Sequence, residues 1–365
     1  MLRRIDSGPA LVSLLGAFVW AMMALLAGAG RAPFGILELL FLFAVLVVVP
    51  LGLDLARVVN PDGDTALFRA ARSLQPFAAV TVVTAFWLPP GRVAALLTAP
   101  WAVFALTLAL SRSARLLPQT KRSSTSWLAS VAFVDLVVGS GWLFLSRAGI
   151  RPMGFLEPIV LLTAVHFHFS GFAAALIAAS ALRLFERHAI DAAYLRRVVW
   201  LVAVLPFVLA LGIAFSPALR SLAALALSAS VTALAALLFW FSSRLETWTA
   251  RLFVRLAASA ALVALSLASA YAVADYTGKP FLTMPAMAST HGLMNSVGFV
   301  LLTMLACLIE LHEVAGDGSP ETHARDRLEG RREAEPEPAT RIPRQDPATA
   351  NRLVPEFLAR DFYDR

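Results

Sequence analysis

Two short polar stretches carry the side chains whose chemistry stands out from an apolar chain. "TAVHFHFSGF" (163–172) contains His166 and His168, and "STHGLMNSVGF" (289–299) contains His291 and Asn295. Neutral imidazole binds copper, iron or haem iron, and histidine exchanges protons near neutral pH. The two stretches therefore predict a proton-handling site or a metal-ligating site.

Helical spacing limits how these side chains can act together. Residues two apart on an α-helix point about 200° apart, so His166 and His168 cannot bind one metal ion unless the helix is distorted. His166 shares a face with Ser170, and His291 shares a face with Asn295, because each pair is four residues apart. We expect one histidine of "HFHF" to face His291 and Asn295.

Two carboxylic acids accompany the histidines within apolar stretches. At 1.5 Å per residue, the histidines and Asn295 lie roughly 10–16 Å below the outer surface, Glu38 lies roughly 8 Å below it, and Asp135 lies near mid-bilayer. Ionisable residues are costly in lipid and usually face the interior of a helix bundle. The predicted substrate or proton path comprises Glu38, Asp135, His166, His168, Ser170, His291 and Asn295.

Composition indicates an all-α, polytopic membrane protein. Hydrophobic residues make up 59% of the 365 and charged residues 15%, against about 45–50% and about 25% in soluble domains. The net charge of +7 comes from short segments between apolar runs, so it indicates topology in a lipid bilayer rather than nucleic-acid binding. The single cysteine excludes a thiolate metal cluster.

The apolar runs predict a transmembrane domain over 1–315 with about ten helices. A segment rich in Pro, Glu and Arg follows over 316–365 and predicts a disordered cytoplasmic tail. The third run ends in "WLPPG", and this sequence and Pro206 hint at broken helices. The predicted spans are 9–30, 33–56, 74–90, 92–111, 125–146, 157–182, 197–215, 219–242, 252–274 and 284–311.

Loop charge predicts the orientation. Sixteen Arg and Lys residues lie in the N-terminal segment and in every second loop, against six in the opposite loops. Because cytoplasmic loops carry the excess of positive charge, we expect both termini in the cytoplasm.

The two polar stretches are similar to each other. "HFSGF" and "NSVGF" each place a polar residue three positions before Gly-Phe, on helices that run in the same direction. Glycine permits close approach of membrane helices, so Gly171 and Gly298 are expected to pack these two helices against each other. The predicted packing positions are Gly171, Phe172, Gly292, Gly298 and Phe299.

"AVHFHFSGF", followed by "HGLMNSVGF", resembles the YndJ-like bacterial membrane proteins. The resemblance implies a protein of the bacterial plasma (inner) membrane, in a family whose biochemical role is not settled and which is sometimes labelled as transporters. Through this likeness the motif positions are His166, His168, Gly171, Phe172, His291, Gly292, Asn295, Gly298 and Phe299.

Three functions remain open. The first is a transporter or proton-coupled carrier of unknown substrate. The second is a redox protein whose metal candidates His166, His168 and His291 bind copper, iron or haem, although the sequence requires no cofactor. The third is a structural role in which the imidazoles only join helices. No GxxxxGK[ST], GxGxxG, HExxH or GxSxG motif occurs, so the sequence leans away from an enzyme.

Overall fold

A computed structural model describes residues 7–113, 123–279 and 281–317. Within these ranges the chain is helical and contains no β-strand. Several long helices contain a π-helical segment between α-helical segments. The main elements are α1 (Ser7–Gly28), α2 (Ile36–Phe43), η1 (Ala44–Val48), α3 (Val49–Val59), α4 (Ala66–Phe86), α5 (Arg92–Ser113), α6 (Ser124–Ala148), α7 (Ile159–His166), η4 (Phe167–Ala173), α8 (Ala174–Arg187), α9 (Ala193–Phe215), α10 (Pro217–Phe241), α11 (Trp248–Thr277), α12 (Met284–Met287), η6 (Ala288–Gly292), η7 (Met294–Leu301) and α13 (Leu302–Asp317).

The expected multi-pass helix bundle is confirmed. Among the described residues, nine helical segments are long and apolar enough to cross a membrane. Helix α4 is not one of the nine, although it has 21 residues, because its first half carries Arg69, Arg72 and Gln75. It ends at Phe86, directly before "WLPPG". The nine segments are Leu11–Gly28, Ile36–Val59, Arg92–Arg112, Ser124–Ala148, Ile159–Arg187, Ala193–Phe215, Pro217–Arg244, Trp248–Thr277 and Met284–His312.

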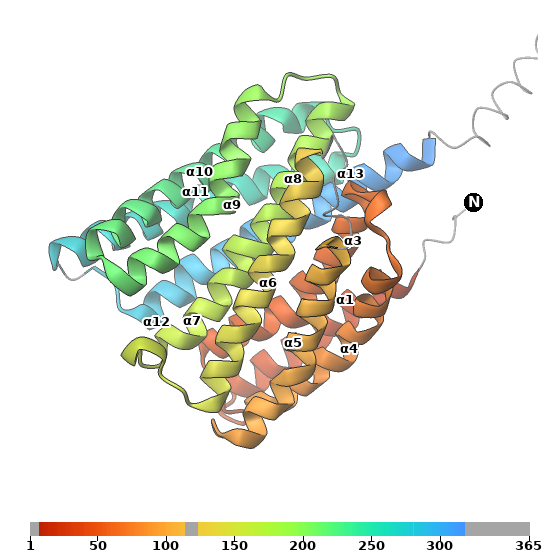
Figure 1. Ribbon diagram of the computed structural model, residues 1–365. Helices are drawn as coiled ribbons and strands as arrows, with labels where there is room; N and C mark the ends of the chain where they lie inside the picture. Colours follow the sequence, from red (N-terminus) through yellow and green to blue (C-terminus); the bar gives the residue numbers. More distant parts are fainter. Residues whose placement is uncertain (1–6, 114–122, 280, 318–365) are drawn as a thin grey trace, which may run out of the picture. The chain divides into compact units, whose positions relative to one another are not determined.

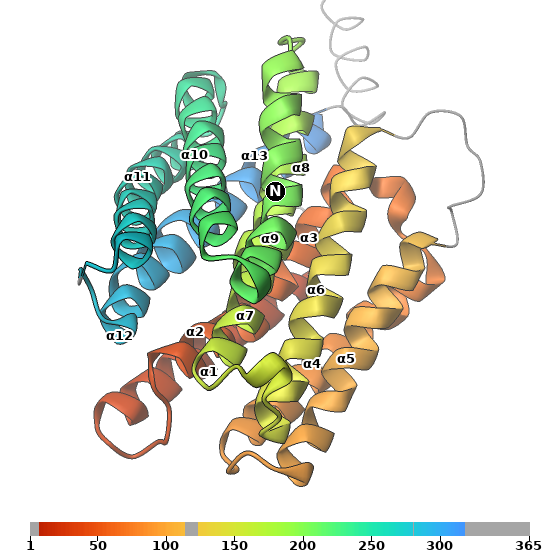
Figure 2. The ribbon, with the colours of Figure 1, turned by 60° about the vertical axis from the view of Figure 1, so that its left-hand side comes forward.

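Successive helices pack side by side in two groups, with α3 and α8 between them. Helices α4, α5 and α6 form one group, and α9, α10 and α11 form the other (Figure 1). Figure 2 shows α3 and α8 between α10–α11 and α4–α5. The most buried spans are Ile36–Val59, at 78%, and Ile159–Arg187, at 72%. The core therefore centres on these two spans, the second of which contains "HFHF".

Within the described residues, the π-helical segments lie in three spans. These spans contain η1, η4 and the pair η6 and η7, and η1, η4 and η7 contact one another. π-helical turns are rare and frequently occur at functional sites. Both histidine motifs therefore lie in irregular helix. The proline hints were less informative, since Pro206 lies inside a continuous α9 and "WLPPG" connects α4 to α5.

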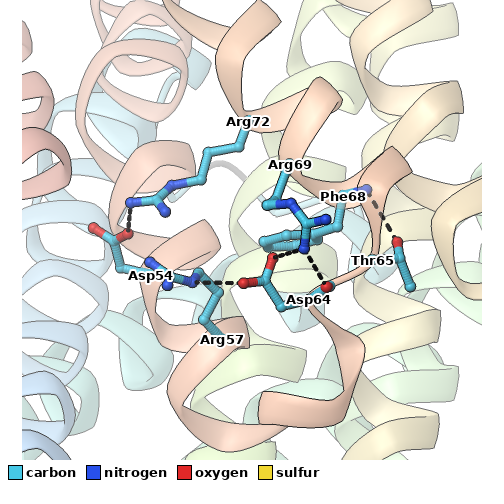
Figure 3. A network of polar contacts seen from close by, with 7 residues as sticks. All are labelled: Asp54, Arg57, Asp64, Thr65, Phe68, Arg69 and Arg72. Atoms are coloured by element: carbon cyan, nitrogen blue, oxygen red, sulfur yellow. Dashed lines mark hydrogen bonds and ion pairs between the residues drawn. The ribbon is translucent and has the colours of Figure 1, made fainter.

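Charged residues fasten the start of α4 to the end of α3 (Figure 3). Arg72 donates to Asp54 at 2.9 Å. Asp64, in the connection, lies 3.7 Å from Arg57 and 3.8 Å from Arg69. The carboxylate of Asp54, near the end of the span Ile36–Val59, is therefore paired with Arg72.

The chain divides into two units, Met1–Gly316 and Asp317–Arg365. Helix α13 ends at Asp317. The tail predicted for 316–365 therefore lies outside the described residues from 318 onward.

Candidate functional site

His168 belongs to the core and uses both ring nitrogens there. Its Nδ1 lies 2.8 Å from the Ala164 carbonyl oxygen, and Trp101 Nε1 donates to its Nε2 at 3.2 Å. A carbonyl only accepts and an indole N–H only donates, so the hydrogen is assigned to Nδ1 and the ring is neutral. The ring is fully buried and also meets the edge of Phe41. His168 therefore has no nitrogen left for a metal ion or a solute.

Glycines allow α6 and η4 to interlock around His168 and Asp135. A Cβ at Gly139 would lie 2.7 Å from His168 Nδ1, and a Cβ at Gly171 would lie 2.6 Å from Asp135 Cγ. Each bulky polar side chain thus occupies the space beside a glycine of the other segment. Membrane helices approach closely at such small residues.

Asp135 is fully buried beside Gly171. Neither carboxyl oxygen has a hydrogen-bond partner among the described residues. An ionised carboxylate without donors is very costly in an apolar environment, so the neutral acid is the form that this packing favours. Asp135 does not line the cavity described next.

A cavity of about 360 Å³ lies within the bundle and brings the two motif stretches together. His166 and Ser170 reach it from α7 and η4, and His291 and Asn295 reach it from η6 and η7. Most of the remaining lining is apolar and comes from α2, α9, α10 and α11. The structure therefore places His166, not His168, in the same cavity as His291 and Asn295.

The two cavity histidines have the same hydrogen-bond arrangement. Nδ1 of His166 lies 2.9 Å from the Leu162 carbonyl oxygen, and Nδ1 of His291 lies 2.9 Å from the Ala264 carbonyl oxygen. In each ring the hydrogen is therefore assigned to Nδ1. The two imidazoles are close enough to interact electrostatically. Each leaves Nε2 as the nitrogen that is free to act in the cavity.

Sequence reasoning missed an ion pair that also lines the cavity. Arg220, in the first turn of α10, donates to Asp275, near the end of α11, and Tyr271 lines the cavity one helical turn earlier. In the sequence, Arg220 counted only as one of the six positive charges in the loops opposite the N-terminus. The available signal was a single acid, Asp275, at the end of an apolar run and opposite an arginine at the same membrane surface.

Glu38 lies away from the cavity lining, although Leu37 and Leu40 belong to it. Its carboxylate interacts electrostatically with Arg147, which also interacts with Glu157. Arg147 is nearly buried and donates to the Leu88 carbonyl oxygen at 2.6 Å. Glu38 therefore interacts with a buried arginine, because α6 continues through Arg147 instead of ending before it.

The motif glycines face other helices than expected. Gly171 packs on Asp135 of α6, and a Cβ at Gly298 would lie 2.6 Å from Ala260 Cβ on α11. The segments η4 and η7 do contact each other. The expected register assumed regular α-helix, and both glycines lie in π-helical turns that rotate the faces. In both cases the glycine packs on the helix that precedes its own span.

The other packing positions are also at close contacts. A Cβ at Gly292 would lie 2.8 Å from Leu40 Cδ1. Phe172 is fully buried, stacks on Phe133 and lies against Gly52 of α3. Phe299 is buried and lines the cavity.

The metal-ligand set expected from the sequence does not assemble. In the part of the chain that the structure describes, no group of three or more His, Cys, Asp or Glu side chains is placed to hold a metal ion. His168 points to Trp101, which leaves His166 and His291 as the two imidazoles of the cavity. Their carbonyl-bonded Nδ1 atoms do resemble those of metal-binding histidines.

Comparisons with known proteins agree with the motifs. The sequence model of the YndJ-like protein family matches residues 39–299. "Uncharacterized membrane protein YndJ" of Bacillus subtilis (strain 168) is 28% identical over 177 residues, which are 48% of this chain and 32% of that relative. The match thus spans about a third of the relative's length. No solved structure matches the chain. Because the family match covers most of a multi-pass membrane bundle and includes both histidine motifs, the chain belongs to the YndJ-like family.

Proposed function

We propose that the protein is a carrier that takes a small amphipathic solute into the cavity and couples its movement to protons. The observation that supports this most is the convergence of His166, Ser170, His291 and Asn295 on one largely apolar cavity. Cavities of roughly 300–1,000 Å³ with apolar walls and a few convergent polar groups are typical of small-molecule sites. Histidine inside a membrane protein also serves in proton relays.

A purely structural role accounts for His168 but not for the cavity histidines. His168 satisfies both ring nitrogens within the core. In the described part of the chain, Nε2 of His166 and of His291 has no such protein partner, and both rings line a cavity. Polar groups retained at an apolar cavity are costly unless something binds to them.

Asp135 is the proposed proton-binding acid of the carrier. Its side chain lies against Gly171. Of the two neighbours of Gly171, Ser170 lines the cavity and Phe172 is buried in the core.

The proposed location is the bacterial plasma membrane, with both termini in the cytoplasm. The excess of positive charge in the cytoplasmic loops favours this orientation. The Arg220–Asp275 pair then lies at the outer end of the cavity.

The experiment is solute-dependent proton movement in proteoliposomes that contain a pH-sensitive dye. A panel of small amphipathic amines, alcohols and acids is offered from outside. Ser170→Ala should reduce any response, whereas Ser140→Ala should not. The two serines are matched, since each donates at 2.7 Å to the carbonyl four residues earlier, but only Ser170 lines the cavity.

The histidine variants have a matched control too. Nδ1 of His188 lies 2.9 Å from the Leu184 carbonyl oxygen, the same arrangement as in His166, and His188 lies outside the cavity lining. His166→Ala and His291→Ala should abolish the response while His188→Ala retains it. No response to any solute in the wild-type protein, at normal protein levels, would contradict the proposal.

A metal-binding redox protein is the second candidate, favoured by the carbonyl-bonded Nδ1 atoms of His166 and His291. Metal analysis and an optical spectrum of the same preparation distinguish the two functions. Copper, iron or haem near one equivalent, lost in His166→Ala and His291→Ala but retained in His188→Ala, would replace the carrier with this candidate.

A further inference from the structure

The hydrogens in the cavity define which solutes it can accept. The ring hydrogens of His166 and His291 are already donated to main-chain carbonyls, so each neutral Nε2 presents a lone pair. Ser170 Oγ donates its hydrogen to the His166 carbonyl oxygen at 2.7 Å, which leaves only its acceptor capacity. Three of the four polar motif side chains therefore present acceptors. The fourth, Asn295, can both donate and accept.

We infer that the cavity binds a small solute with an apolar body and a hydrogen-bond-donating head group, an amine or an alcohol. This inference rests on the proposed function and specifies its solute. The apolar body would contact the aliphatic and aromatic lining, for which Leu40, Leu209, Val231 and Phe299 are representative. A carboxylate or an ether of the same size brings no donor, so it would leave the imidazole lone pairs unmatched.

Protons and the solute then compete for the same atoms. A proton on Nε2 removes the lone pair and converts the acceptor into a charged donor, which repels an ammonium, whereas an alcohol can still accept from the ring. Binding of an amine is therefore expected to weaken as the pH falls and the two histidines take up protons. This competition is the physical basis for exchanging a proton for the solute.

The other ionisable groups at the cavity do not supply the same competition. Arg220 of α10 and Asp275 of α11 pair with each other, and among the described residues Tyr271 is the remaining ionisable member of the lining besides the two histidines. The lining from α2 and α9 is apolar. Replacing both histidines with glutamine retains an acceptor near the position of Nε2 but removes the titratable group. If the histidines cause the pH dependence of solute binding, it is lost in this variant; if the Arg220–Asp275 pair causes it, it remains.

A cysteine-protection assay tests the solute class. Ala268 of α11 lines the cavity, is half-buried and takes no part in the polar set, so Ala268→Cys provides a reporter for a water-soluble maleimide. The native Cys307 is buried, and the chain without the reporter measures its background labelling. The probes are benzylamine, benzyl alcohol, benzoate and anisole, which share a ring and differ in the head group.

Benzylamine, benzyl alcohol or both should slow labelling at concentrations about three- to tenfold lower than anisole and benzoate, as the loss of one or two hydrogen bonds implies. The rate ratio with and without benzylamine should move toward one as the pH is lowered from 8. In the His166→Gln, His291→Gln variant, whatever protection is measured at pH 8 should no longer change as the pH is lowered.

Two failures are distinguishable. Equal or better protection by anisole or benzoate, or an unchanged pH dependence in the glutamine variant, overturns the solute class but leaves an occupied cavity and the carrier intact. No protection by any probe, together with no solute-dependent proton movement in proteoliposomes, overturns the carrier as well.

Discussion

Replacing Gly139 with alanine should destabilise the bundle far more than the same change two residues later. The added Cβ would lie 2.7 Å from His168 Nδ1 and 2.8 Å from Cε1. The imidazole can move away only by losing its bonds to Ala164 and Trp101. Overpacking costs about 1–3 kcal/mol and each hydrogen bond about 0.5–1.5 kcal/mol, so the expected loss is about 2–6 kcal/mol.

Gly141 is the matched control, because a Cβ there meets nothing within 4 Å. Both substitutions gain the same helix propensity, about 1 kcal/mol, so the difference between them isolates the contact with His168. The assay is unfolding of the detergent-solubilised protein by sodium dodecyl sulfate titration. In a His168→Ala background, Gly139→Ala should lose most of its effect. Equal stability of Gly139→Ala and Gly141→Ala would refute the interlocked packing of α6 and η4.

Two further substitutions test contacts outside the cavity. Trp101→Phe removes the donor to the buried Nε2 of His168 and should cost about 1–3 kcal/mol in the same unfolding assay; an unchanged midpoint would show that this nitrogen is satisfied otherwise. Arg72→Ala leaves the mostly buried Asp54 unpaired and should cost about 1–3 kcal/mol. Arg196→Ala, which removes an exposed pair at 3.9 Å, should stay within about 0.5 kcal/mol, and equal losses at both arginines would contradict this assignment.

Much of the fold follows from the sequence because bilayer thickness fixes the length of apolar helices. Helix α4 shows where this reasoning weakens. Its first half is polar enough to fall outside the candidate spans, yet it forms one continuous helix with the apolar second half. A tertiary ion pair, Asp54 with Arg72, holds that polar half, and such a partner is not visible in local composition.

The shared face of His291 and Asn295 was predictable because four-residue spacing survives moderate helix distortion. The distinction between His166 and His168 required the structure, although Ser170 already gave the face of His166 a second polar residue. The partners that decide it, Trp101 and Gly139, lie on other helices.

The π-helical turns were not predictable from these residues. Their hydrogen bonds depend on how neighbouring spans pack, so no local sequence pattern predicts them. They also explain why Gly171 and Gly298 face α6 and α11 rather than each other.

Cysteine accessibility tests the central claim, that the two motif stretches line one cavity. Ser170→Cys and Asn295→Cys should react with a water-soluble maleimide in the folded, detergent-solubilised protein, because both positions are half-buried at the cavity. Ser140→Cys and Ser296→Cys, which are buried outside its lining, should react only after unfolding. Equal labelling of all four cysteines, or protection of Ser170→Cys and Asn295→Cys until unfolding, would contradict the account.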